Sequence, residues 1–179
     1  MLRGHEIPVA AAAAWAGLLA LVTLSGTVVI ACMMPFAAIA AISALSLSLR
    51  AGLGAVGLCW LGNQILGFGL MGYPWDTVTF AAGVSLLAAS LAGFFVARQV
   101  SADLALPRSL GAFVLGFITY ELVLLAYAFG FGDLAMFSPR IVGLIAFNDA
   151  LWFAALWLGW QVFSSVVALQ PNADEPAAK

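Results

Sequence analysis

Two acidic side chains interrupt long apolar segments, and they are the residues best placed to do chemistry. Glu121 stands in "ITYELVLL" and Asp149 in "AFNDALWF". A charged side chain at the centre of a membrane helix costs roughly 2.5–3.5 kcal/mol on insertion scales. Each acid is about 14 residues, or about 20 Å of helix, from the turn that joins their two segments, so both lie at similar depth. Helix-to-helix hydrogen bonding, substrate binding and proton relay all remain open for this pair.

Amides and tryptophans accompany the acids. Asn63 and Gln64 stand side by side in one apolar segment, and Asn148 precedes the second acid. Trp60 shares a helix face with Asn63, while Trp152 lies one turn beyond Asn148. Amides beside tryptophans suit a flat, partly polar small molecule. Five polar residues on three helices therefore favour a lined cavity over simple helix packing.

The stretch "GYPWD" (72–76) and Arg140 predict the rim of this cavity. Asp76 stands where a helix N-cap belongs, and Tyr73 and Trp75 suit a membrane interface. Capping and anchoring alone would explain most of this turn. We nevertheless include Tyr73, Trp75, Asp76 and Arg140 among the candidate substrate-binding residues, because they lie at the face from which the polar groups are reached.

Composition identifies the class of protein. Of the 179 residues 65% are hydrophobic and 8% are charged, against about 25% charged in a soluble domain. Long apolar runs predict an all-α, polytopic membrane bundle, since an open sheet would leave backbone groups unpaired in lipid. Six scattered basic residues argue against nucleic-acid binding. With one histidine, two separated cysteines and no nucleophile–base pair, we expect no metal, no cofactor and no enzymatic activity.

The apolar runs predict one domain over 1–166 with six transmembrane helices. The first run is long enough for two helices, and Ser25-Gly26 is its natural break, with Pro35 kinking the second helix. Residues 167–179 predict a disordered cytoplasmic tail. The expected helices lie near 8–24, 27–48, 51–71, 77–97, 109–129 and 140–166.

The positive charges predict the orientation. Six spans put both termini on one side of the membrane, and five basic residues then share that side while Arg140 alone lies on the other. The positive-inside rule makes the richer side cytoplasmic. We therefore expect a multi-pass protein of the bacterial inner membrane with both termini in the cytoplasm. The five residues on that side are Arg3, Arg50, Arg98, Arg108 and Lys179.

The first predicted helix carries a stripe of small residues, Ala12, Ala16 and Ala20, which allows close helix approach inside the protein or to a partner. Six helices in about 180 residues, this stripe and polar groups reached from the outer face resemble the S-components of energy-coupling-factor vitamin transporters. The resemblance implies a vitamin or cofactor-precursor ligand and docking through the stripe to a transmembrane coupling subunit driven by two ATPases. The minimal connection at Ser25-Gly26 departs from the longer lid of that family.

The leading hypothesis is thus a substrate-binding subunit of a small-molecule uptake transporter, with its cavity between the third, fifth and sixth helices. Two alternatives stay open. A structural or assembly subunit would satisfy every buried polar group with protein. A small proton-coupled carrier would use Glu121 and Asp149.

Overall fold

The computed structural model describes residues 7–29, 34–100, 105–131 and 134–169. Within these ranges the chain forms six α-helices and no strand, so the all-α prediction is confirmed. A π-helix (Leu66–Leu70) continues the third helix, and a 3₁₀ turn (Leu134–Phe137) precedes the last. Of the predicted tail, residues 170–179 lie outside the described ranges. The helices are α1 (Val9–Val29), α2 (Phe36–Ser46), α3 (Leu49–Ile65), α4 (Thr77–Val100), α5 (Leu106–Phe131) and α6 (Pro139–Ala168).

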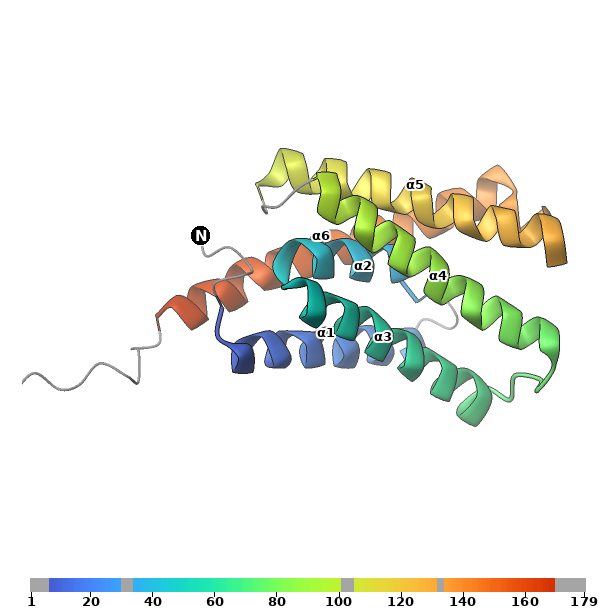
Figure 1. Ribbon diagram of the computed structural model, residues 1–179, viewed down its shortest axis with the longest axis horizontal. Helices are drawn as coiled ribbons and strands as arrows, with labels where there is room; N and C mark the ends of the chain where they lie inside the picture. Colours follow the sequence, from blue (N-terminus) through green and yellow to red (C-terminus); the bar gives the residue numbers. More distant parts are fainter. Residues whose placement is uncertain (1–6, 30–33, 101–104, 132–133, 170–179) are drawn as a thin grey trace, which may run out of the picture.

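Four segments are long and apolar enough to cross a membrane, namely Leu49–Leu70, Thr77–Val100, Leu106–Phe131 and Pro139–Ala168. They run along the long axis of the bundle, and α1 begins at the end where α6 finishes (Figure 1). Their length and composition make the chain a helical membrane protein.

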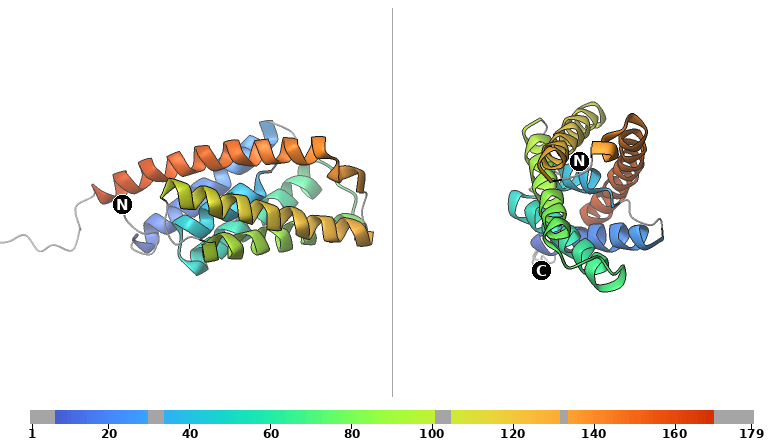
Figure 2. Two further views of the ribbon diagram at one scale, coloured as in Figure 1. Left: turned by 90° about the horizontal axis from the view of Figure 1, so that it is seen from above. Right: turned by 90° about the vertical axis from the view of Figure 1, so that its right-hand side faces the viewer.

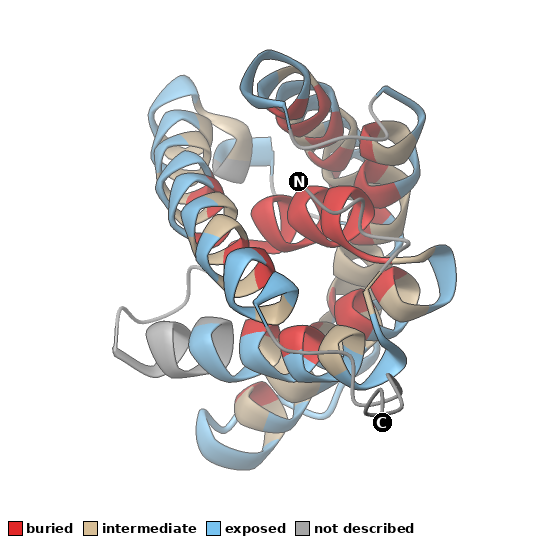
Figure 3. Ribbon diagram, turned by 90° about the vertical axis from the view of Figure 1, so that its left-hand side faces the viewer, coloured by how far each residue is buried: buried red, intermediate tan, exposed pale blue. Residues whose placement is uncertain are grey.

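The short helix α2 forms the centre of the bundle. All 11 of its residues are buried, which makes it the uniformly red helix in Figure 3. It contacts α3, α4, α5 and α6, which surround it in the end-on view of Figure 2. At about 1.5 Å per residue it is about 16 Å long, close to half of a hydrocarbon core about 30 Å thick. α2 is therefore a half-helix that is covered by protein on every side.

The expected division of the first apolar run needs correction. Ser25-Gly26 lies within α1, which continues to Val29, and the second helix begins after Pro35 rather than being kinked there. Proline has no N–H to donate and fixes its own φ, so it suits a helix start better than a helix interior. The helix expected over 27–48 is consequently reduced to half its length.

Helices α4 and α5 approach most closely at two glycines. A Cβ added to Gly93 would lie 2.9 Å from the carbonyl oxygen of Gly116, and one added to Gly116 would lie 3.1 Å from that of Gly93. The two backbones are therefore nearly in contact at this crossing, which leaves little space for a side chain at either glycine.

We expect Gly93→Ala to lower the free energy of unfolding by about 1–3 kcal/mol, since the added methyl group forces the helices apart. The measurement is unfolding in mixed micelles titrated with SDS. Gly111→Ala is the matched control, because nothing lies within 4 Å of its Cβ position. Equal stability of the two variants would contradict the close crossing.

Candidate functional site

The buried start of α2 is capped by a side chain from another helix. Pro35 occupies the N-cap position and offers no side-chain oxygen to the first N–H groups of α2. Asp149 of α6 supplies the missing acceptor. Its Oδ1 accepts a 2.8 Å hydrogen bond from the N–H of Ala38, and its carboxyl group also accepts one from the N–H of Ala37. Asp149 is 1% exposed. Its carboxyl group therefore lies at the positive end of the helix dipole.

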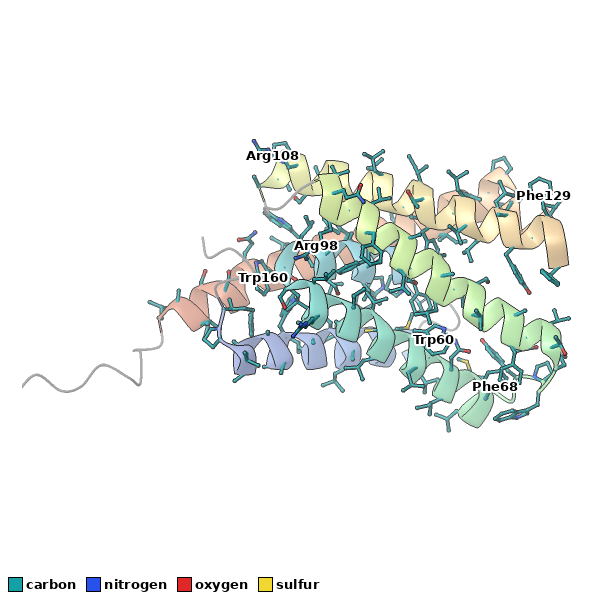
Figure 4. The ribbon with its side chains drawn as sticks, in the orientation of Figure 1. Trp60, Phe68, Arg98, Arg108, Phe129 and Trp160 are labelled. Atoms are coloured by element: carbon teal, nitrogen blue, oxygen red, sulfur yellow. The ribbon has the colours of Figure 1, made fainter. Side chains whose placement is uncertain are left out.

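The other end of α2 is held by a cation. Nη1 of Arg98 donates to the carbonyl oxygens of Ala44 at 3.0 Å and Leu47 at 2.9 Å. Trp15 of α1 donates from Nε1 to Oγ of Ser46 at 3.1 Å. Arg98 lies at the same end of the bundle as Trp160 and Arg108, whereas Phe68 and Phe129 lie at the opposite end (Figure 4). An acidic side chain thus lies at the N-terminal end of α2 and a basic one at its C-terminal end, which is the arrangement that the helix dipole favours.

Glu121 lies near the capped start of α2. It is half-buried, and it is close enough to Asp149 for the two carboxyl groups to interact electrostatically. Oε1 of Glu121 is buried and has no hydrogen-bond partner among the described residues. Buried Tyr120 is close enough to interact electrostatically with both acids. The two acids that were predicted to lie at similar depth are therefore close to each other. Asp149 is hydrogen-bonded to α2, whereas Oε1 of Glu121 is not hydrogen-bonded to any described residue.

An aromatic cluster adjoins this point. Phe36 of α2 and Tyr120 of α5 belong to one buried cluster, and Trp60 of α3 packs against it. Nε1 of Trp60 donates to the carbonyl oxygen of Gly83 at 2.7 Å. Gln64 packs on the same glycine, because a Cβ there would lie 2.7 Å from its Oε1. Trp60 thus belongs to the α2 region, while Gln64 faces α4.

The remaining predicted residues are more dispersed. Asn63, Asn148 and Trp152 are half-buried, and Trp152 packs against the main core. Arg140 is exposed in the first turn of α6. Among the described residues, no group of three or more His, Cys, Asp and Glu side chains is arranged to hold a metal ion.

The turn between α3 and α4 is exposed and aromatic. Phe68 stacks on Phe80 with ring centroids 4.9 Å apart and lies 4.7 Å from Trp75 and 6.3 Å from Tyr73. Asp76 caps α4, as predicted, by accepting a 2.8 Å bond at Oδ1 from the N–H of Thr79. Capping and ring stacking thus account for the local contacts of these predicted rim residues.

The small-residue stripe of α1 faces inward. Ala16 is buried in the main core, and Ala12 and Ala20 pack against that core partly buried. The face of α1 that stays exposed carries Ala13 and Gly17 instead. Internal helix packing is therefore what the stripe provides within this chain.

Sequence reasoning did not single out Arg98 or Tyr120 as part of this region. Arg98 was used as an orientation signal, and nothing in its position alone indicates that it reaches back to α2. The serines of "ISALSLS" (42–48) are far from Arg98 in the sequence and approach it only in the folded chain. They are the one sequence signal that this segment ends inside the protein. Tyr120 directly precedes Glu121 and could have been included as its neighbour.

Comparison with protein-family models, with curated proteins and with solved structures finds no match to this chain.

We expect Asp149→Ala to lower the free energy of unfolding by about 1–3 kcal/mol, because it leaves buried N–H groups of α2 without an acceptor. Asp149→Asn retains an acceptor oxygen and should lose less. SDS titration in mixed micelles measures both. Leu151→Ala, at a position that is 56% exposed, is the control. An Asp149→Ala variant as stable as this control would contradict the capping role.

The cap at Asp76 should depend on pH. The hydrogen bond from the N–H of Thr79 holds the pKa of Asp76 below its ordinary value of 3.8, and a hydrogen bond from the Thr79 hydroxyl adds to this effect. The cap is thus complete above pH 3.8 and is lost as the pH falls through the lowered pKa. Amide exchange in the first turn of α4 should be slower in the wild type than in Asp76→Ala at pH 5, and the difference should vanish once the pH is well below the lowered pKa of Asp76. A constant difference across this range would exclude a carboxylate cap.

Proposed function

We propose that this protein is the substrate-binding integral membrane subunit of a small-molecule uptake transporter. The observation that carries the proposal is the half-helix α2, which begins inside the bundle near Glu121, whose Oε1 is buried without a partner among the described residues. Discontinuous helices that end near the midplane are typical of transporter binding sites, because irregular backbone is tolerated there only inside protein or along a cavity.

The chemistry beside α2 favours a ligand that donates a hydrogen bond. Asp149 is already engaged by the N–H groups of α2, whereas Oε1 of Glu121 lacks a donor among the described residues. A buried carboxylate oxygen is costly unless a donor reaches it. An ammonium, amide or hydroxyl group on the ligand would supply that donor, and Trp60 with its aromatic cluster would contact a flat apolar part. A vitamin or cofactor precursor has this character.

Uptake through such a subunit requires an energy source outside the chain. By the resemblance to energy-coupling-factor transporters, a transmembrane coupling subunit with two ATPases would provide it in the bacterial inner membrane. Because Ala16 is buried, docking of that subunit on α1 would use the exposed face with Ala13 and Gly17.

The electrostatic interaction between Glu121 and Asp149 favours one alternative, a small proton-coupled carrier. Two carboxyl groups that interact at low dielectric readily hold one proton between them. Uptake into proteoliposomes would distinguish the two functions. A carrier responds to a pH gradient in the absence of any partner, and a binding subunit does not.

Native mass spectrometry of the protein, purified in mild detergent, tests the proposal. We expect a co-purified small molecule whose occupancy falls by about tenfold or more in Glu121→Gln, since a hydrogen bond to a charged group contributes about 1.5–3 kcal/mol. Leu122→Ala is the matched control, because the neighbouring side chain is 59% exposed.

The other outcomes are equally informative. A bound molecule that is indifferent to Glu121→Gln would place the binding site elsewhere. A preparation without a small molecule, but with a stoichiometric protein partner, would overturn the proposal and make the chain an assembly subunit.

A further inference from the structure

An apolar groove lies between α5 and α6, and its lining begins at Ala150, which follows Asp149 in the sequence. It encloses a cavity of about 250 Å³. One wall comes from Leu106, Leu110 and Phe113 of α5, and the other includes Ala154, Trp157 and Leu158 of α6. Leu106 is 50% exposed and Leu158 59% exposed, so the groove opens on the outer surface of the bundle, which faces lipid in a membrane. None of the residues predicted to bind substrate lines it.

Beyond the apolar lining of the groove, the next residue on this face of α6 is an amide. Phe113 stacks on Phe153 with ring centroids 4.6 Å apart, which sets the register of the antiparallel pair. Leu106 lies seven residues before Phe113, and Trp160 lies seven residues after Phe153. In an antiparallel pair Leu106 is therefore level with Trp160 and the adjacent Gln161. Gln161 lies one turn beyond Trp157 on the same face of α6. Its Nε2 is buried and has no acceptor among the described residues.

Positive charge lies at this end of the bundle, on the side of α5 away from the groove, because Arg108 is about 200° around the helix from Leu106. Arg108 is exposed in the first turn of α5 (Figure 4), and the first N–H groups of α5 point to the same end. The groove thus has an apolar stretch, about 10 Å long on α5 from Leu106 to Phe113, that runs parallel to the helices. Beyond this apolar lining, toward the end of the bundle, lie Gln161 of α6 and the first N–H groups of α5.

We propose that this groove is a binding site for a single glycerophospholipid. Its acyl chain fills the space between α5 and α6, and its phosphate or ester oxygens accept from Nε2 of Gln161. The orientation of such a lipid matches the bilayer leaflet at this end, with its polar part outward and its chain toward the midplane. The inference is independent of the proposed transport function, because it concerns different residues.

The test is lipid retention. The full-length protein is reconstituted into vesicles of phosphatidylethanolamine and phosphatidylglycerol, extracted into lipid-free detergent and examined by native mass spectrometry. The wild type should retain one phospholipid that Ala154→Trp loses, because the indole fills the groove. Ala155→Trp is the matched control, since the adjacent alanine is exposed but does not line the groove. Gln161→Leu should reduce retention by about fivefold, the factor of one net hydrogen bond. Gln99→Leu, at an exposed glutamine of α4, should leave it unchanged.

Equal lipid retention in Ala154→Trp and Ala155→Trp, with both folded by thermal unfolding, would mean that only bulk lipid adheres and would overturn the proposal. Loss of retention in Ala154→Trp with no effect of Gln161→Leu would overturn the headgroup contact. A second copy or a partner protein that is displaced by Ala154→Trp, in place of lipid, would assign the groove to a protein interface.

Discussion

The hydrogen bonds from the first N–H groups of α2 to Asp149 are the contact on which the rest of the bundle depends. A helix that starts inside an apolar medium exposes N–H groups that no water can reach. Asp149 satisfies them from a position 111 residues away in the sequence. It thereby fixes where α6 lies against α2, and Arg98 does the same for α4 at the other end. Two ionisable side chains thus position two of the long helices through one short helix.

The same contact separates the roles of the two acids. Asp149 accepts hydrogen bonds from the end of a helix, whereas Oε1 of Glu121 has no hydrogen-bond partner among the described residues. Helix capping and the proposed ligand binding therefore need not compete for one carboxylate. The outer aromatic turn and the groove between α5 and α6 are formed by other residues, and their chemistry can be considered separately.

Most of the helices could be predicted because charges and turn residues mark their ends. The segments expected at 51–71 and 77–97 correspond to Leu49–Leu70 and Thr77–Val100, which are separated by the "GYPWD" turn. The α2 segment could not be delimited in this way. Its sequence, "FAAIAAISALS", is small and apolar on all sides, and such a helix reads the same whether lipid or protein surrounds it. Pro35 and the serines of α2 were the available signals, and a kink was the wrong interpretation of the proline. The contacts of Asp149 and Arg98 join distant segments, so only the folded chain reveals them.

The position of α2 divides the bundle into unequal halves. The half that contains α2 is filled by buried side chains such as Ile39, Ile42 and Phe94, whereas beyond its start the buried residues of α3, α4 and α5 are few and small, among them Gly67, Gly83 and Ala128. A close-packed interior resists rearrangement, and a loosely filled one does not. Motion should therefore be concentrated at the end where α3 turns into α4, while the opposite end should stay rigid. Rearrangement of the bundle would then be confined to one of its two ends.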